Sequence, residues 1–409
     1  MNLVFLADVS AAHVIGGAER MLREQALGLS RLGHRVQLVT RAPISDSRPH
    51  VRIDGVDEWR FLVERDHEVS FLLSTIQRST EIFDRITARR RPDVVLIHQA
   101  TAGIGPMLMR RNVPRSWMYM CHSLAHEEYA TRSNEVVSGV DILRRSANTQ
   151  GRYWTEHYVI SRCSRVIVLS EFMRDRVLRF HRIPNRRVWQ IPGAADPERF
   201  QPAADRPRVR RELGLPQDRT ILFTVRNLVP RMGLDLLIEA MVRLGEDGHD
   251  VMLVIGGEGP MRSALAEQIH RHGLTGRVHL TGFVPEEQLS RYYQAADLVV
   301  VPTAQLEGFG LVTVEALACG TPVLGTPIGA LPEILRRIDP ALVTDSADTE
   351  SLADGIRRLL RRCAEQPGEQ ERLARKGRQL IERELNWSQH IVNLESVLMG
   401  DQRQQRRAA

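Results

Sequence analysis

The sequence predicts an α/β protein of two doubly wound domains, in which parallel strands alternate with helices. The chain has 409 residues, which is too long for one ordinary core and suits two domains. Short apolar runs alternate with amphipathic stretches in both halves, as expected for strands and helices of parallel sheets. A proline-containing stretch at 191–210 interrupts this alternation.

The apolar runs of the first half are short and are bounded by polar residues or by glycine and proline. We expect them to be buried strands: Leu3–Ala7, Val36–Thr40, Val94–His98, Trp117–Cys121 and Val166–Leu169. Helical patterns such as Ala18–Leu32 and Glu171–Phe180 lie between them. Residues 1–192 are therefore predicted to form an N-terminal domain with a mainly parallel sheet and helices on both faces.

The stretch Ile191–Arg210 lacks apolar periodicity, and we expect it to be the interdomain linker. The alternation then restarts with these expected strands: Ile221–Val225, Met252–Ile255, Val278–Thr281, Leu298–Val301 and Pro322–Leu324. The helical patterns between them include Gly233–Leu244, Met261–His272 and Glu286–Ala296. Residues 193–385 are predicted to form the second doubly wound domain, and the tail 401–409 is predicted to be disordered.

The charge balance and the composition argue against a nucleic-acid partner. Lys and Arg number 56 against 50 Asp and Glu, for a net charge of +6, but the arginines are scattered. Aromatic residues make up 5% of the chain, too few for a platform that stacks bases. We therefore expect a charged, solvated surface and no nucleic acid.

The N-terminus and the cysteines indicate the cytoplasm. The residues MNLVFLADVS lack the basic region of a signal peptide and run into the first expected strand. No apolar run approaches the length of a membrane span. The cysteines are far apart and form no metal or redox motif: Cys121, Cys163, Cys319 and Cys363.

Peripheral contact with the inner face of the cell membrane is the alternative location. The helix predicted at Thr75–Arg91 combines apolar residues with arginines, a pattern that suits docking on anionic lipids. A helix packed on the sheet, with a solvated basic face, is the favoured interpretation of the same pattern.

The strongest functional signal is Glu307-Gly-Phe-Gly-Leu-Val-Thr-Val-Glu315, which follows an expected strand and begins a helix. Gly308 and Gly310 allow a sharp turn that exposes backbone N–H groups, and the helix start offers further N–H donors to a phosphate. A carboxylate at Glu315 is placed to accept both hydroxyls of a ribose. An ordinary strand–helix turn is the alternative, since short glycine motifs occur by chance.

Several further segments, in order along nearly the whole chain, resemble glycosyltransferase family 4 of the retaining GT-B type. They are GGAER near the start, LSEFMRD at 169–175, IPGAADPERF at 191–200, VRNLVPRMGLDLLIEA at 225–240, GGEGP at 256–260, LTGFVP at 280–285 and YYQAADLVVVP at 292–302. The Glu307–Glu315 spacing matches the Glu-x7-Glu signature of that family. The resemblance implies two Rossmann-like domains facing a central cleft, with the donor on the C-terminal domain. It also implies a final helix, at 386–400, that crosses back to the N-terminal domain.

The resemblance assigns roles to matching residues. Glu307 is expected to contact hydroxyls of the transferred sugar near the reacting carbon, and Glu315 to bind the ribose. The turn that contains Phe283 and Val284 is expected to frame the base. The loop and helix start after Glu307 are expected to hold the pyrophosphate, largely through backbone groups: Gly308, Phe309, Gly310, Leu311 and Val312.

Arg226 matches a family arginine that grips the diphosphate. Its fixed charge and its fork of donors suit a leaving phosphate whose charge grows as the glycosidic bond breaks. The family usually has a lysine directly before the glycine of this segment, but this chain has Met232 there, preceded by Arg231. We expect Arg231 to reach the phosphates instead. If it does not, slow catalysis or a degenerate binder is expected.

The N-terminal domain contributes two expected site elements. Gly16 and Gly17 follow the first strand and allow the backbone to approach a ligand, and the family uses this loop near the donor diphosphate and the acceptor. His122 ends a strand, where the family often has a histidine that faces the donor sugar. The alternatives are that Gly16 and Gly17 form a plain turn and that His122 has a structural role. His126, Glu127 and Glu128 are candidates for contacts with the acceptor, but a solvated loop is the favoured interpretation of this segment.

These patterns predict transfer of a hexose from a nucleotide sugar, UDP-sugar favoured, to a hydroxyl acceptor in glycan, glycolipid or natural-product biosynthesis. Catalysis is assigned to Glu307, His122 and Arg226. No Asp-x-Asp motif stands at a strand end, so no metal or other cofactor is predicted. Alternatives are a GDP-sugar mannosyltransferase, another GT-B enzyme such as an epimerase or phosphorylase, and a non-catalytic sugar-nucleotide binder. The resemblance implies retention by front-face attack, with the leaving phosphate taking the acceptor's proton.

Overall fold

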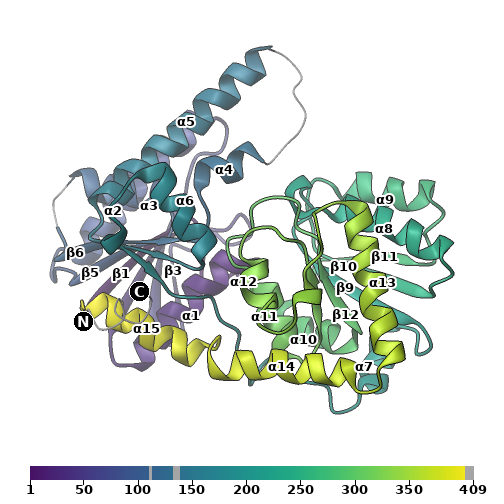
Figure 1. The fold of residues 1–409 in the computed structure, drawn as a ribbon. Helices are drawn as coiled ribbons and strands as arrows, with labels where there is room; N and C mark the ends of the chain where they lie inside the picture. The colour runs from purple at the N-terminus through teal and green to yellow at the C-terminus, as the bar shows by residue number, and fades with distance from the viewer. Residues whose placement is uncertain (110–112, 132–138, 401–409) are drawn as a thin grey trace. The chain divides into compact units, whose positions relative to one another are not determined.

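The computed structural model describes residues 1–109, 113–131 and 139–400 (Figure 1). The described residues divide into two compact units. The first comprises those of Met1–Glu127, Val137–Pro192 and Trp387–Ala409, and the second those of Glu128–Val136 and Gly193–Asn386. The tail 401–409, which we predicted to be disordered, lies outside the described residues.

The first unit contains one sheet with the order β3-β4-β2-β1-β5-β6-β7-β8. Its strands are β1 (Asn2–Ala7), β2 (Arg35–Arg41), β3 (His50–Ile53), β4 (Val56–Phe61), β5 (Val94–Ile97), β6 (Ser116–Cys121), β7 (Arg165–Val168) and β8 (Val188–Gln190). Strands β3 and β4 pair antiparallel, and the other neighbours in this sheet pair parallel. Every residue of β1 and β5 is buried, because both faces of a central parallel strand are covered.

The helices of the first unit connect these strands. They are α1 (Gly17–Arg31), α2 (Glu68–Thr87), α3 (Ala100–Met109), α4 (Ala125–Ala130), α5 (Gly139–Arg162), α6 (Glu171–His181) and, from the end of the chain, α15 (Trp387–Met399). The residues of α4 from Glu128 onward belong to the second unit. Figure 1 shows α15, in yellow, beside α1. A side chain at Gly28 of α1 would collide with Ile391 of α15, so this glycine allows the two helices to pack closely. The final helix thus belongs to the first unit.

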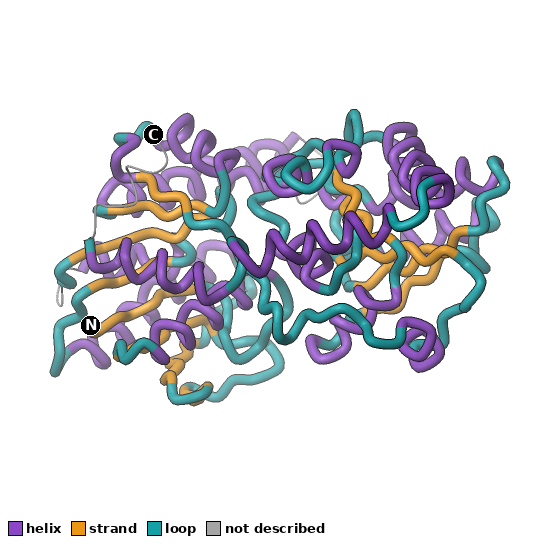
Figure 2. Tube along the Cα trace, turned by 60° about the horizontal axis from the view of Figure 1, so that its bottom comes forward, coloured by secondary structure: helices purple, strands orange, loops and turns teal. Residues whose placement is uncertain are grey.

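The second unit contains a parallel sheet with the order β11-β10-β9-β12-β13. Its strands are β9 (Thr220–Val225), β10 (Val251–Gly256), β11 (Val278–Gly282), β12 (Leu298–Val301) and β13 (Val323–Gly325). Its helices are α7 (Arg206–Glu212), α8 (Leu234–Glu246), α9 (Arg262–Arg271), α10 (Glu286–Ala295), α11 (Leu311–Ala318), α12 (Leu331–Leu335), α13 (Thr349–Glu365) and α14 (Glu369–Arg383). The strands of each unit form one layer (orange in Figure 2).

The strand order of the second sheet determines where a ligand can bind. The chain first builds β9, β10 and β11 in one direction across the sheet and then returns to add β12 and β13 on the other side of β9. Ligands of doubly wound sheets bind at the carboxyl ends of the strands where this reversal occurs. The predicted doubly wound α/β class is confirmed, and the switch point lies between β9 and β12.

The interdomain linker predicted over Ile191–Arg210 is wrong in its length. Residues from Gly193 onward belong to the second unit. Phe200 is buried, and Arg378 donates hydrogen bonds to the carbonyl oxygens of Phe200 at 2.6 Å and Pro197 at 2.9 Å. Prolines removed the periodicity of this stretch without preventing it from packing.

The helix predicted at Thr75–Arg91 is α2, which begins earlier, at Glu68. Ile82 and Phe83 of this helix are buried in the hydrophobic core of the first unit. The favoured interpretation of this helix, a helix packed on the sheet, accounts for these two buried residues. Among the described residues, no helix combines the length and the apolar character needed to cross a membrane.

Candidate functional site

Three polar side chains meet at the switch point of the second sheet. Arg226 directly follows β9, and Thr303 and Glu307 lie in the loop after β12. Arg226 donates through Nη2 to Thr303 Oγ1 at 2.7 Å and to the carboxylate of Glu307. Thr303 donates in turn to Glu307 Oε2 at 3.0 Å. The sequence pattern predicted Arg226 and Glu307 but not Thr303, whose only signal is its position just beyond a strand.

Arg226 and Glu307 compensate each other's charge in a largely buried setting. Their side chains are 5% and 12% exposed. The pairing matters at this depth, because either charge alone would be costly to bury. Nε of Arg226 is buried and has no hydrogen-bond partner among the described residues, so this arginine retains a donor for an anion.

The start of α11 presents backbone donors beside this cluster. Gly310, the N-cap of α11, has φ 85°, a conformation that favours glycine, and no side chain caps the helix. Leu311 and Val312 are the first residues of α11, so their N–H groups have no acceptor inside the helix. The positive end of the helix dipole adds to these donors, and the combination suits an anion.

The side chain of Phe309 has a structural role. It is buried and lies against Gly193, where any side chain would collide with the phenyl ring. Of the loop residues that we expected to hold pyrophosphate, Phe309 can therefore contribute only through its backbone.

Glu315 lies on α11 and is buried. Tyr293, on α10, donates its hydroxyl to Glu315 Oε2 at 3.0 Å. Since Tyr293 is fully buried, its hydroxyl holds the carboxylate in one orientation. The sequence pattern did not identify Tyr293, because its partner lies on a different helix.

In the segment where a methionine replaces the usual lysine, two adjacent side chains lie in different environments. Met232 is buried and faces the interior of the unit. Arg231 Nη1 donates to the carbonyl oxygen of Leu306 at 2.9 Å, one residue before Glu307. Gly233 has φ 66°, and a side chain there would collide with the carbonyl of Pro302. This close approach brings Arg231 to the loop that carries Glu307.

The turn after β11 exposes an aromatic ring. Phe283 is 51% exposed, whereas the adjacent Val284 is buried against Gly256. An exposed ring at the carboxyl end of a strand offers an apolar face on which a flat base can stack. Both residues lie where the sequence pattern placed them, at the turn expected to frame the base.

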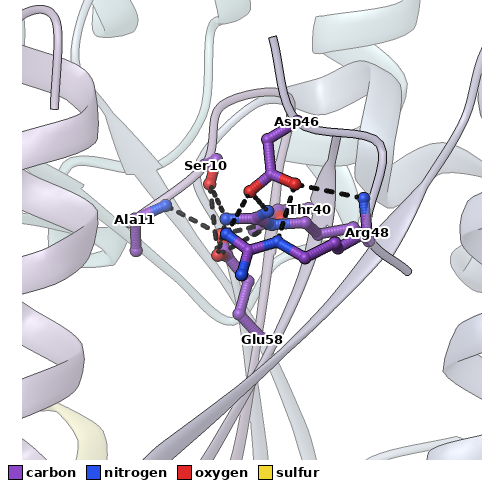
Figure 3. A network of polar contacts seen from close by, with 7 residues as sticks. Ser10, Ala11, Thr40, Asp46, Arg48 and Glu58 are labelled. Atoms are coloured by element: carbon purple, nitrogen blue, oxygen red, sulfur yellow. Dashed lines mark hydrogen bonds and ion pairs between the residues drawn. The ribbon is translucent and has the colours of Figure 1, made fainter. Parts of the chain in front are cut away.

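In the first unit, Gly16 is the N-cap of α1 and Gly17 is its first residue, and no side-chain hydrogen bond caps this helix. The loop that leads to these glycines is held by Glu58, a buried residue of β4 that the sequence pattern did not identify. Glu58 accepts hydrogen bonds from Ser10 Oγ at 3.1 Å and from the Ala11 N–H at 2.8 Å (Figure 3). Hydrogen bonds to a buried carboxylate are strong, so this loop is preorganised.

The Glu58 network extends to one further strand, β2, and to the loop that contains Asp46. Thr40, at the end of β2, donates to Glu58 Oε1 at 2.9 Å, as Figure 3 shows. Arg60 of β4 donates through Nε to Glu58 at 3.0 Å and through Nη1 to Asp46 at 2.7 Å. Asp46 also accepts from Arg48 at 2.8 Å. The carboxyl ends of β1, β2 and β4 are thereby tied together.

His122 directly follows β6, and its Nε2 lies 3.0 Å from Nδ1 of His98, which directly follows β5. Burial, with a smaller contribution from His390, lowers the pKa of His122 to about 4. The residues weighed as acceptor contacts have other partners. His126 is buried with its ring against Phe180, and Glu127 pairs with Arg176, so both have structural roles.

Comparison with known proteins identifies the family of the chain. The family model of glycosyl transferases group 1 matches residues 205–380, and the model of Glycosyltransferase Family 4 matches residues 15–199. A D-inositol 3-phosphate glycosyltransferase of Mycobacterium sp. (strain KMS) is 30% identical over an alignment of 359 residues, which covers 85% of this chain and 78% of that protein. The chain belongs to glycosyltransferase family 4.

Solved structures show the same fold at lower identity. Sucrose-phosphate synthase of Thermosynechococcus elongatus has a TM-score of 0.81 with 23% identity, and each chain is covered completely, at 100%. HepE of Anabaena, solved in complex with UDP and glucose, has a TM-score of 0.72 with 20% identity over 98% of this chain and 99% of that chain. The chain therefore has the GT-B fold and is a glycosyltransferase.

Proposed function

We propose that this family 4 enzyme is a retaining, metal-independent hexosyltransferase with a UDP-sugar donor, bound at the switch point of the second sheet. The observation that carries the proposal is the cluster of Arg226, Thr303 and Glu307 beside the uncapped start of α11. It places a cation, a carboxylate and backbone N–H donors at the edge of one sheet.

In the proposed complex, the diphosphate lies at the start of α11 and Arg226 donates to it. In the part of the chain that the structure describes, the guanidinium Nε is buried without a partner, and the first N–H groups of α11 have no acceptor inside the helix. Together they stabilise the negative charge that develops when the bond between the sugar and the phosphate breaks. Fixed cations and the helix dipole thus take the role that a divalent metal has in other transferases. Arg231, held at the same loop, supplies the second cation in place of the usual lysine.

The two glutamates bind different parts of the donor. Glu307 accepts hydrogen bonds from hydroxyls of the transferred sugar, close to the diphosphate held by Arg226. Glu315, oriented by Tyr293, accepts from the ribose hydroxyls. Phe283 stacks on the base. The acceptor binds on the first unit, near Gly16, Gly17 and His122, attacks from the face that the phosphate leaves, and transfers its proton to that phosphate.

The acceptor class is a hydroxyl compound of glycan, glycolipid or natural-product biosynthesis. The Mycobacterium relative carries a name that states transfer to D-inositol 3-phosphate, which makes this compound the first acceptor to test. UDP is the first nucleotide to test because HepE, which shares the fold, was solved with UDP.

The deciding experiment is thermal unfolding of the full chain with UDP, GDP, ADP and their common sugar conjugates, with magnesium and with a chelator. A ligand at a hundred times its dissociation constant stabilises the folded state by about 2.7 kcal/mol, which is readily measured. UDP or a UDP-sugar should raise the midpoint equally with and without metal. Stabilisation by GDP alone would favour a GDP-sugar mannosyltransferase, and a strict need for magnesium would overturn the metal-independent mechanism.

Stabilisation by a nucleotide sugar with no turnover would favour the non-catalytic binder. This alternative is tested because Met232, at the position of the usual lysine, is buried and has no charge. The product of a positive reaction decides the stereochemical proposal. An NMR spectrum of the new linkage should show the anomeric configuration of the donor, and the inverted configuration would contradict retention.

A further inference from the structure

His98 and His122 occupy equivalent positions on neighbouring strands. Strands β5 and β6 pair in parallel, and each histidine is the first residue beyond the carboxyl end of its strand. Nδ1 of His98 lies 3.0 Å from Nε2 of His122, and the ring centroids are 5.2 Å apart with an interplanar angle of 29°. The imidazoles are therefore joined by a direct hydrogen bond.

His98 is fixed by its burial, by a ring contact and by a backbone hydrogen bond. It is 2% exposed and packs on Phe5 of β1, with ring centroids 5.3 Å apart. Its backbone N–H donates to the carbonyl oxygen of Leu6 at 2.8 Å. His122, by contrast, is only half-buried. The buried histidine is thus the fixed member of the pair, and the more exposed histidine is the member that a ligand can reach.

Both imidazoles are neutral at physiological pH. Burial lowers the pKa of His98 well below its ordinary value, with a smaller effect from His122, and burial lowers the pKa of His122 to about 4. A neutral imidazole has one N–H donor and one bare nitrogen acceptor. A hydrogen bond between two neutral imidazoles therefore couples their tautomers, because the bonded nitrogens must be one donor and one acceptor.

The second ring nitrogen of His98, Nε2, indicates which tautomer is present. Its Nε2 is buried and has no hydrogen-bond partner among the described residues. A buried N–H without an acceptor is rarer than an acceptor that lacks a donor. His98 therefore carries its proton on Nδ1 and donates it to Nε2 of His122. His122 must then carry its own proton on Nδ1, which leaves that N–H as its donor to a ligand.

We propose that His98 is a positioning residue: its hydrogen bond fixes the ring and the tautomer of His122, so that His122 offers an N–H donor to the substrate bound by the first unit. This role rests on the proposed function, which places a substrate near His122, but the orientation of His122 can be tested without any ligand. Neither histidine of this pair titrates near neutral pH, so the donor is available across the physiological range.

The first measurement is the ¹⁵N spectrum of the imidazole nitrogens in the full-length protein labelled at histidine, with the His122 signals assigned by their loss in His122→Gln. The expected spectrum shows a single tautomer of His122, protonated on Nδ1. An averaged spectrum, or the opposite tautomer, would overturn the proposal. This measurement needs no variant of His98 and no substrate.

Two variants of His98 separate positioning from simple packing. His98→Leu fills the space but cannot donate, whereas His98→Asn keeps an N–H donor on the atom that replaces Nδ1. We expect His98→Leu to average the His122 signals and to lower kcat for release of UDP from UDP-glucose on the order of 10- to 100-fold, with KM changed less than about threefold. His98→Asn should restore the single tautomer and most of the activity.

The chain provides a matched control in a second histidine pair. Nδ1 of His157 lies 3.4 Å from Nδ1 of His181, with stacked rings, on helices α5 and α6. His157→Leu should leave the His122 signals and kcat unchanged. If His98→Leu also leaves both unchanged, or if His98→Asn is as impaired as His98→Leu, His98 only packs. If the unmodified protein releases no UDP, the proposed donor is wrong, and the spectrum still decides the role of His98.

Discussion

Arg226 donates a hydrogen bond to the carboxylate of Glu307, 81 residues further along the chain, and Thr303 donates to the same carboxylate oxygen. The pair links the end of β9 to the loop after β12, so each residue holds the other in place at the switch point. A donor diphosphate that binds Arg226 therefore brings the sugar next to Glu307.

We expect Glu307→Gln to lower turnover on the order of 100-fold while donor affinity changes only a few-fold. The amide preserves the size of the side chain but removes its negative charge, which strengthens the hydrogen bonds from the sugar hydroxyls. Initial rates of nucleotide release and calorimetric donor affinity test this. Glu267→Gln removes a carboxylate from an exposed ion pair with Arg271 and should behave like the parent. Parent-like turnover in Glu307→Gln would exclude a role at the reacting centre.

Arg226→Ala should weaken donor binding and turnover together, because it removes the cation for the diphosphate in both the ground and transition states. It should also destabilise the fold by about 3 kcal/mol, since Glu307 is left buried without its partner. The double variant Arg226→Ala/Glu307→Gln should regain stability but not activity, as denaturant unfolding and rate measurements can show. Additive losses of stability would mean that the two side chains are not coupled.

Arg231→Ala should lower turnover if Arg231 supplies the second cation. The sharper test adds Met232→Lys, which restores the lysine usual in the family. We expect Arg231→Ala/Met232→Lys to recover part of the lost activity, because a lysine stem can cross the buried position and extend its charge outward. Midpoints of thermal unfolding control for folding. If Arg231→Ala is silent in transfer assays, the phosphates are bound without it.

Tyr293→Phe should raise the KM for the donor several-fold with a smaller change in kcat, because Glu315 loses the donor that orients it towards the ribose. The lost buried hydrogen bond should also cost about 1–2 kcal/mol of stability. Binding of the nucleotide should weaken, whereas binding of inorganic pyrophosphate should not. An equal loss for both ligands would place Tyr293 outside ribose recognition.

Stability should fall as the pH decreases from about 6.5 to about 4. His122 and His390 both have pKa values lowered by burial from 6.5 to about 4, so they are neutral in the folded state in this range. The unfolded chain takes up a proton at each, and the state that binds more protons gains as pH falls. The contribution of these two histidines to the free energy of unfolding is thus fully present above pH 6.5 and is lost progressively as the pH falls towards 4.

His390→Gln isolates one of these contributions. His390 Nδ1 donates to the carbonyl oxygen of Pro192 at 2.6 Å, and its Nε2 lies 2.9 Å from Gln25 Nε2. The variant should be less stable near neutral pH, because these hydrogen bonds change, but its unfolding midpoint should depend less on pH. Identical pH dependence of variant and parent would show that His390 is not held neutral in the folded protein.

Two strands that are rich in polar residues, β3 and β4, were not predicted from the sequence. β4 was not predicted because its inward positions hold Glu58 and Arg60, which give no apolar alternation. These residues are buried only because Ser10, Ala11 and Thr40 donate to Glu58 from other segments. β3 is also polar and largely exposed, so it lacks the same signal.

The sequence by itself determined the doubly wound class, most of the buried parallel strands, and the Arg226, Glu307 and Glu315 positions, because apolar runs, glycine turns and residue spacings are local properties. Only the tertiary structure decided that Arg226 pairs with Glu307, Tyr293 with Glu315, and His98 with His122. Each of these contacts joins segments that the order of strands and the packing of helices bring together. Partners of this kind are set by topology, and no local pattern of residues encodes them.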